Sequence, residues 1–400
     1  MNTATLDIKK RKVLFPKLRF QEFNEEWKES KLGDIGKIRM CKRVFSNETS
    51  EKGEIPFYKI GTFGKEADAY ITNELYLNYK SRFSYPKIGD ILMSASGTLG
   101  RTIIFDGKPA YFQDSNIVWI DNNEEFITNS FLYIIYQIVR YESEGGTIQR
   151  LYNSIISNTK FNNPTISEQQ KIASFLSTVD EKIQQLSHKK KLLEQYKKGV
   201  MQQLFSGKLR FKDENGEDYL NWEEKKLGEV CKLNPKSSFL PSSFIYIDLE
   251  SVVSGRLLKE TRIQLSEAPS RAQRLLSSED ILFQMVRPYQ KNNLFFNRNG
   301  EYVASTGYAQ LRAKENSMFL YQLIHTTDFV NKVMDRCTGT SYPAINSSDL
   351  ANIEIVMPSA SEQQKIADFL SSIDTKIEST NKQITQTQTF KKGLLQQMFV

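Results

Sequence analysis

The chain has 400 residues, with 39% hydrophobic residues, 25% charged residues and a formal net charge of +7. This composition predicts a globular protein of two or three domains, and it excludes a largely disordered chain. No apolar run approaches the about 20 residues of a membrane-spanning helix, and three widely spaced cysteines exclude a disulfide framework, so we expect a cytoplasmic protein.

The chain opens on an N-terminal segment, residues 1–27, which holds the tetrapeptide KLRF at 17–20 and ends at Trp27. This tryptophan begins the pattern W-x-x-x-x-L-G-[DE]. The same tetrapeptide recurs at 208–211, and the same pattern begins again at Trp222. The chain therefore contains an internal repeat, which has to be recognised before a fold is assigned.

Residues 28–163 are predicted to form a first globular module of mixed helices and strands. Short β-like runs such as NIVWI at 116–120 alternate with turn residues, and a helix is expected at 129–142. The glycine-rich loop SASGTLGR at 94–101 could cradle a phosphate through its backbone N–H groups. The candidate nucleic-acid contacts of this module are Arg43, Tyr58, Lys59, Lys80, Arg82, Ser96, Thr98 and Arg101.

Residues 164–207 are predicted to form a long helix. Ser167 and Gln170 have the spacing of a capping box at its start. About forty helical residues span roughly 60 Å, and a helix this long with one apolar stripe needs a partner. The apolar stripe has heptad-like spacing and consists of Ile172, Leu176, Val179, Ile183 and Leu186.

Residues 208–357 are predicted to form a second mixed module, with a helix near 317–335. The segment FQMVRPYQKNN at 283–293 corresponds to the loop at 94–101, so the two modules differ where they align. Side chains of the types found there bond base edges and phosphates, although each single residue is also compatible with an ordinary surface position. The candidate nucleic-acid contacts of this module are Arg256, Arg262, Arg271, Arg274, Gln284, Arg287, Tyr289, Lys291, Asn292, Thr306, Tyr308 and Ser341.

Residues 358–400 are predicted to form a second long helix, which aligns with the first without a gap. Its stretch Ser361–Ala367 is identical to Ser167–Ala173, and it repeats the predicted capping box with Ser361 and Gln364. We expect the two helices to pair antiparallel as a coiled coil; the alternative is that each packs only on its own module. The second apolar stripe consists of Ile366, Leu370, Ile373, Ile377 and Ile384.

The order of the repeated parts is cyclic. The first long helix runs directly into KLRF at 208–211, whereas the second long helix ends where a third copy of KLRF would follow. We therefore expect the two chain ends to lie close together, and we expect a pseudo-twofold relation between the copies. The helices are alike while the modules differ, which is the pattern of a fixed scaffold that displays two different readers.

Patterns of catalytic and metal chemistry are missing from the chain. Its two histidines leave little material for histidine-based catalysis. No NTP-binding loop, zinc-protease pattern or nucleophile elbow occurs. The excess of positive charge is compatible with a polyanionic partner. We expect no catalytic activity, no metal site and no bound cofactor in this chain.

The twice-occurring SEQQKIA helix and the W-x-x-x-x-L-G-[DE] pattern resemble those of the specificity subunit of type I restriction-modification systems. The resemblance covers essentially the whole chain, although residues 380–389 of the second helix are richer in glutamine and threonine. It implies an α+β fold in which two target-recognition domains are separated by an antiparallel coiled coil. Each domain would read one half of a split site in double-stranded DNA.

The resemblance also implies partners. Two modification (methyltransferase) subunits and two restriction (translocase and nuclease) subunits would assemble with this chain. S-adenosylmethionine, ATP and Mg²⁺ would then be bound by those partner subunits, and no membrane would be involved. A different class of protein, a coiled-coil adaptor that links two protein ligands, would share the helices but would show no salt-dependent affinity for DNA.

Overall fold

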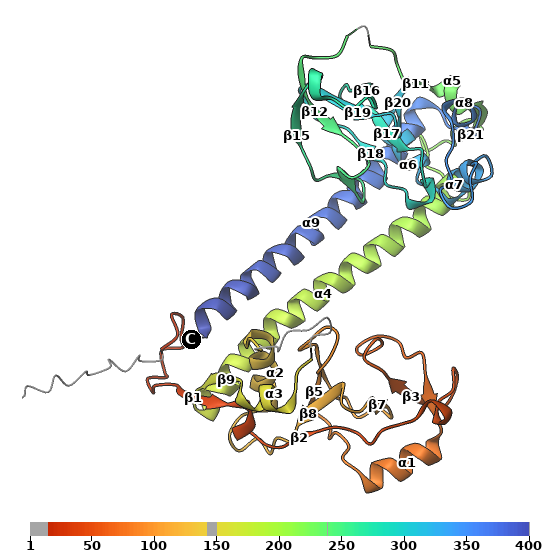
Figure 1. Ribbon diagram of the computed structural model, residues 1–400. Helices are drawn as coiled ribbons and strands as arrows, with labels where there is room; N and C mark the ends of the chain where they lie inside the picture. The colour runs from red at the N-terminus through yellow and green to blue at the C-terminus, as the bar shows by residue number, and fades with distance from the viewer. Residues whose placement is uncertain (1–14, 142–149, 238, 400) are drawn as a thin grey trace, which may run out of the picture. The chain divides into compact units, whose positions relative to one another are not determined.

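The computed structural model describes residues 15–141, 150–237 and 239–399. The chain divides into two compact units, one drawn from Met1–Gln185 with Ile384–Val400 and the other from Leu186–Gln383 (Figure 1). Each unit holds one globular module and parts of two long helices, α4 (Ile166–Phe205) and α9 (Ala360–Met398). The predicted α+β fold with two modules and two long helices is confirmed. No helix in the described part of the chain is long and apolar enough to cross a membrane.

The first module contains short strands and helices between the N-terminal segment and α4. Its elements are β1 (Lys28–Lys31), η1 (Leu32–Asp34), β2 (Ile38–Arg39), η2 (Ser46–Glu48), β3 (Ile55–Tyr58), β4 (Tyr70–Ile71), α1 (Asn73–Arg82), β5 (Ile91–Ser94), β6 (Thr102–Ile104), β7 (Tyr111–Phe112), β8 (Ile117–Ile120), α2 (Asn129–Ile138), α3 (Asn153–Asn158) and β9 (Lys160–Asn163). They form a central sheet in the order β2-β8-β5-β6, a second sheet β4-β3-β7 and the pair β1-β9.

The second module repeats this plan between α4 and α9. Its elements are β10 (Glu223–Lys226), α5 (Leu227–Val230), β11 (Cys231–Leu233), β12 (Ser243–Ile247), β13 (Val252–Val253), β14 (Arg256–Leu257), β15 (Thr261–Gln264), η3 (Leu265–Glu267), β16 (Ala272–Leu275), β17 (Ile281–Gln284), η4 (Pro288–Gln290), β18 (Leu294–Phe295), β19 (Tyr302–Ser305), β20 (Tyr308–Ala313), α6 (Ser317–Leu323), α7 (Thr327–Met334), α8 (Ser347–Ala351) and β21 (Glu354–Met357). The central sheet has the order β11-β20-β17-β18, and β10 pairs with β21 as β1 pairs with β9. The repeat seen in the motifs therefore extends through the modules.

The central sheet of the first module is buried on both faces. Successive side chains of a strand point to opposite faces, so Ile91 and Met93 of β5 join the core formed with α2 and the long helices. Leu92, which lies between them, joins a separate core with the sheet β4-β3-β7 and α1. The second module divides β17 in the same way, with Ile281 and Phe283 in one core and Leu282 in another. Double-sided burial explains why both strands read as unbroken apolar runs.

Two local predictions need correction. The predicted capping boxes are wrong, because α4 begins at Ile166 and α9 at Ala360, so Ser167 and Ser361 lie inside the helices rather than ahead of them. In α9 the residue ahead of the helix caps it, since Ser359 Oγ accepts the N–H of Glu362 at 3.4 Å. The helix expected at 129–142 is present as α2, which ends at Ile138, and the region 317–335 holds two helices, α6 and α7, instead of one.

Candidate nucleic-acid interface and its helical scaffold

Within the second unit the two long helices run antiparallel. Lys197 Nζ of α4 forms an ion pair with the carboxylate of Asp374 of α9 at 2.7 Å. Seven residues earlier in α4 and seven residues later in α9, Lys190 Nζ donates to Asn381 Oδ1 at 2.9 Å. Residue numbers therefore fall along α4 as they rise along α9. Ile366, Leu370 and Ile373 of α9 are buried here with the end of α4, in one core with the module.

The first unit contains the same ion pair with the two helices exchanged. Lys391 Nζ of α9 lies 2.7 Å from the carboxylate of Asp180 of α4. Lys391 occupies the motif position of Lys197, and Asp180 occupies that of Asp374. Each unit thus has the same polar contact between the start of one long helix and the end of the other.

The residues predicted for the helical seam are largely buried. Leu394 and Met398 of α9 pack with the start of α4 in the core of the first unit, which confirms a helix-to-helix contact beyond packing on the module alone. Ile183, Ile377 and Ile384 are half-buried. The buried members of the predicted seam are Ile172, Leu176, Val179, Leu186, Ile366, Leu370 and Ile373.

The two repeated motifs touch each other inside each unit. In the first, Arg19 of KLRF donates from Nε and Nη2 to the carboxylate oxygens of Glu168, both at 2.7 Å. In the second, Arg210 makes the same two-pronged contact with Glu362, at 3.0 and 2.7 Å. Both glutamates are 0% exposed. A fork of this kind is the strongest geometry available to an arginine and a carboxylate, so it fixes the N-terminal segment of each copy to the start of a long helix.

The tryptophans of the repeat differ in their partners. Trp222 Nε1 donates to Glu362 at 3.0 Å, so this carboxylate has a third donor. Trp27 is buried against the rings of Phe131 and Phe399, and its Nε1 has no partner within the described residues. The first carboxylate therefore depends more heavily on its arginine.

The described ends of the chain meet in the first unit. The N–H of Leu18 donates to the carbonyl of Gln397 near the end of α9 at 2.9 Å. The same bond occurs inside the continuous chain of the second unit, where the N–H of Leu209 donates to the carbonyl of Gln203 at 3.1 Å. The expectation that the two ends lie close together is confirmed for the described ends, which begin at Phe15 and stop at Phe399.

A buried glutamine follows the motif glutamate in each copy, and its bonds differ. Gln169 accepts the N–H of Thr128 through Oε1 at 2.9 Å and donates to Asn163 at 3.0 Å. Gln363 donates to the carboxylate of Glu315 at 2.6 Å, while its Oε1 has no partner within the described residues. These contacts tie each long helix to the loop ahead of the helix that covers the central sheet.

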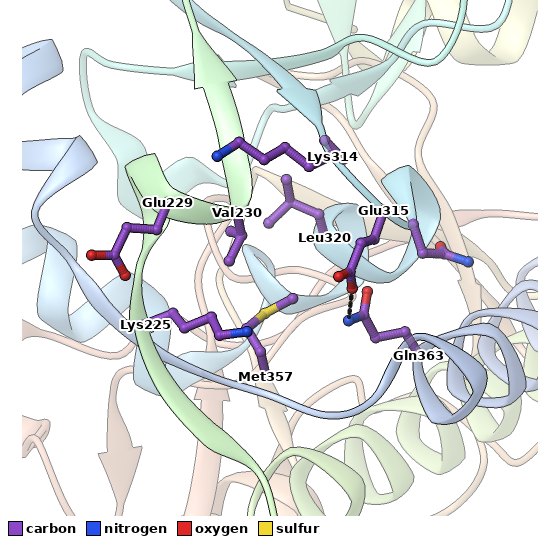
Figure 2. Close-up of a pocket in the computed structure, with 10 residues that line it drawn as sticks. Lys225, Glu229, Val230, Lys314, Glu315, Leu320, Met357 and Gln363 are labelled. Atoms are coloured by element: carbon purple, nitrogen blue, oxygen red, sulfur yellow. Dashed lines mark hydrogen bonds between the residues drawn. The ribbon is translucent and has the colours of Figure 1, made fainter.

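A small cavity borders Gln363 in the second module. Its volume is about 70 Å³, and Lys225, Lys314, Glu315 and Met357 are among the residues that line it. Figure 2 shows the bond between Glu315 and Gln363 at its wall. A space of this size holds a few water molecules, which can satisfy the free amide oxygen.

The predicted phosphate cradle at 94–101 is a tight turn between β5 and β6. The N–H of Arg101 donates to Ser94 Oγ at 2.9 Å, and the N–H of Gly100 donates to the Ser94 carbonyl at 3.0 Å. Thr98 is exposed at the tip. The N–H groups of Ser94 and Ala95 are engaged as well, by the carbonyls of Arg101 and Asn116. Phosphate binding by the other N–H groups of the turn stays a prediction.

The other candidates of the first module have partners within the protein. Arg101 Nη1 donates to the carbonyl of Phe63 at 2.9 Å. The remaining contacts are Arg43 with Asp114 at 3.0 Å, Lys59 with Asp68 at 2.9 Å, Lys80 with the Tyr76 hydroxyl at 3.1 Å, Arg82 with Asn78 at 3.4 Å, Ser96 with Asn116 at 2.8 Å, and Tyr58 stacked on Phe112.

The candidates of the second module fall into paired and unpaired groups. The paired ones are Arg256 with Glu378, Arg262 with Glu301, Lys291 with the carbonyl of His325, and Asn292 with the carbonyl of Val252. The exposed ones without a side-chain partner within the described residues are Arg271, Tyr289 and Ser341. Thr306 is half-buried. Arg274 is half-buried too, and this burial lowers the pKa of its guanidinium.

Two predicted contacts are corrected by their burial. Tyr308 is 0% exposed, in a core with residues of β12, β17 and β19, and Gln284 is 5% exposed. Gln284 donates to the carbonyl of Val286 at 2.7 Å, which places it among the groups that shape the turn after β17. Both side chains therefore belong to the interior of the module, and neither is exposed to contact a base.

The modules contain buried thiols and a buried imidazole. The part of the chain that the structure describes contains no group of three or more His, Cys, Asp or Glu side chains placed to hold a metal ion. Burial raises the pKa of Cys41 and of Cys231 to about 12, which keeps both thiols protonated. Burial also lowers the pKa of His325 to about 4, so its ring is neutral at pH 7.

Comparison with known proteins assigns the family. The family model described as the type I restriction modification DNA specificity domain matches residues 24–195 and, a second time, residues 219–388. The two matches together cover most of the chain. The chain therefore belongs to the family of type I restriction-modification DNA specificity proteins, with one specificity domain in each matched stretch.

Relatives of this family are found among curated proteins and solved structures. A type I restriction enzyme specificity subunit of Haemophilus influenzae is 57% identical over 160 residues, which are 40% of this chain and 41% of that protein. The MjaVIII specificity subunit of Methanocaldococcus jannaschii is 26% identical over 335 residues, 76% of this chain and 77% of that one. In fold, the chain is similar to the crystal structure of an S subunit from M. genitalium, with a TM-score of 0.60, 17% identity, and coverage of 97% and 99% of the two chains.

Proposed function

We propose that this chain is the non-catalytic DNA-reading subunit of a type I restriction-modification enzyme, in which each module reads one half of a bipartite target. The proposal rests on a contrast between the contacts of the long helices, which are alike in the two units, and the turns of the modules, which differ. The Arg–Glu and Lys–Asp pairs are the same in both units. The turns after β5 and β17 differ, with SASGTLGR in one and FQMVRPYQKNN in the other. Constant scaffold contacts with variable turns suit two readers of different sequences.

The reading itself would combine phosphate and base contacts. Basic side chains on phosphates fix the register of a protein on duplex DNA, and side chains at base edges in the major groove supply the specificity. Half-sites about one helical turn apart, ~34 Å, lie on one face of the duplex, and two modules of one chain would each bind one of them. Two readers on one chain also raise the effective concentration for the second contact.

The long helices would set the spacer between the half-sites and dock two modification subunits, with two restriction subunits completing the enzyme. Lys189, Lys191 and Lys198 are exposed on α4 and are available for such contacts. S-adenosylmethionine, ATP and Mg²⁺ would be bound by the partner subunits, and this chain would supply none of the reacting groups. Adding one helical turn to the long helices is expected to change the spacer and to leave both half-sites as they are.

Exchange of one module tests the proposal. The full-length chain and a chimera that carries residues 28–163 of another family member are each used to select sequences from randomised duplex DNA. We expect one half of the selected target to change and the other to stay. The reciprocal exchange of residues 223–357 is the matched control, and it should change the other half. A change in both halves, or in neither, contradicts the modular reading.

Salt dependence separates DNA reading from the adaptor alternative. Each phosphate neutralised by a lysine or arginine contributes about −0.9 to the slope of log affinity against log salt on duplex DNA. We expect a slope of several units for the full-length chain. A coiled-coil adaptor that links two protein ligands would show no such slope, and that result would favour the alternative.

A further inference from the structure

The turns that follow β5 and β17 have the same backbone connections despite their different sequences. In the first module the N–H of Leu151 donates to the carbonyl of Ala95 at 2.8 Å. In the second the N–H of Ile345 donates to the carbonyl of Met285 at 3.1 Å. A single β-bridge follows one residue later in each turn. The two turns can therefore be compared position by position.

The next position of each turn has a left-handed backbone. It is Gly97 in the first module, with φ of +66°, and Arg287 in the second, with φ of +53°. Glycine adopts this region freely, whereas a side chain there meets the following carbonyl group. The second module thus places an arginine where local backbone preference favours glycine. Residues held in such backbone conformations cluster at functional sites, so the left-handed conformation of Arg287 indicates a functional role.

The guanidinium of Arg287 is positioned by an aromatic ring and not by a carboxylate partner. Its Cζ lies 4.1 Å from the ring centroid of Tyr342, and its backbone N–H donates to the carbonyl of Pro343 at 2.7 Å. Its Nε is buried without a hydrogen-bond partner within the described residues, and no carboxylate among them forms an ion pair with the guanidinium. The ring contact engages the face of the guanidinium, and the two Nη groups at its outer edge are left for another acceptor.

Most other arginines of the second unit are neutralised. Those in ion pairs with carboxylates are Arg210, Arg256, Arg262, Arg298 and Arg312. Arg287 differs from these in being both oriented and uncompensated. Tyr342, its ring partner, is 65% exposed, and Tyr289, two residues along the chain from Arg287, is 50% exposed. The position is therefore open to a large ligand.

We propose that Arg287 reads a guanine in the half-site recognised by the second module, with Tyr342 as the positioning residue. This inference rests on the proposed function and deepens it. An arginine edge matches the O6 and N7 acceptors of guanine in the major groove, and this bidentate pair is the commonest specific contact to DNA. Gly97 offers no such donor, so the first module reads its half-site by other groups.

The test compares full-length variants in selection from randomised duplex DNA. For Arg287→Gly we expect one guanine of the wild-type target to lose roughly tenfold to a hundredfold of its preference, with the other half-site unchanged. Arg287→Lys should keep overall affinity but relax the same position, because an ammonium group lacks the fork of N–H donors. Tyr342→Ala should relax it to a smaller extent.

Stability measurements separate reading from folding. In Arg287→Gly, relief of the left-handed backbone offsets the lost ring contact, so we expect the melting temperature to stay within about 2 °C of the wild type. Glu279→Gly is the matched control, because Glu279 is exposed on the same module with φ of +70°. It should relieve the same strain and leave the selected sequence unchanged.

Each remaining outcome has a defined meaning. An unchanged target in Arg287→Gly overturns the inference. So does a uniform loss of affinity with a salt slope smaller by about one, which marks a phosphate contact instead. A large fall in melting temperature assigns Arg287 to folding. If the wild-type chain selects no sequence at all, the proposed function fails, and the inference falls with it.

Discussion

Removal of Arg19 is expected to destabilise the first unit strongly. The carboxylate of Glu168 is buried and accepts both donors of Arg19 at 2.7 Å, while Trp27 Nε1 has no partner and does not replace them. Loss of one member of a buried ion pair costs about 3–5 kcal/mol, because the other charge stays buried. Since the Arg19 side chain is 12% exposed, some water can enter, and we expect about 3 kcal/mol for Arg19→Ala.

The second unit offers an internal comparison. Arg210→Ala leaves Glu362 with the N–H of Trp222 at 3.0 Å, and the Arg210 side chain is 24% exposed. The remaining donor and the easier access of water should reduce the loss to about 2 kcal/mol. A double replacement of Arg19 and Glu168 by Met and Leu should recover most of the loss, since no unpaired charge is left inside.

Urea denaturation combined with native-state hydrogen exchange measures and locates the effect. For Arg19→Ala, faster exchange should be confined to peptides of the first unit, and for Arg210→Ala to those of the second. Lys160→Ala serves as the control, because its pair with Glu29 is exposed on both sides. The reasoning is refuted if Arg19→Ala destabilises no more than this control, or if its effect appears in the second unit.

Two further predictions follow from the second unit and from the chain ends. Burial lowers the pKa of His325 to about 4, whereas a histidine of the unfolded chain has a pKa of about 6.5, so the unfolded chain binds the proton first. The free energy of unfolding therefore falls by up to about 3 kcal/mol as the pH drops from 6.5 towards 4. Urea denaturation at pH 7 and pH 5 should show that His325→Gln weakens this pH dependence. A circular permutant opened between Gly207 and Lys208, with Val400 joined through one glycine to Lys17, should melt within a few degrees of the wild type and select the same DNA; a loss of cooperative melting by circular dichroism would count against the shared end contact.

The helices and the repeat could be predicted because they depend on local spacing. The apolar stripe that begins at Ile172 recurs every three or four residues, and this period indicates both a helix and its buried face. The central strands gave a weaker signal. IVWI at 117–120 is buried on both faces, and an apolar run without alternation does not show which residue faces which core.

The polar residues were harder to place. Gln284 and Tyr308 have side chains suited to base contacts, yet the first shapes a turn and the second fills a core. Glu168 and Glu362 are charged residues of the repeated motif, and their complete burial was not predicted from the sequence. The joint recurrence of KLRF with SEQQKIA was the available signal, because two motifs that repeat together are expected to touch.

The interchangeability of the two helix ends has a consequence for shorter chains. The first unit takes Lys391, Leu394 and Met398 from α9, and α4 carries Lys197, Val200 and Leu204 at the matching positions. A polypeptide with only one module and one long helix would thus hold both halves of the missing contact. Two identical copies would complete each other as a homodimer and, under the proposed function, read a palindrome. When the two copies are joined in one chain, their modules no longer need to have the same sequence. Each module can then change its DNA sequence preference independently of the other.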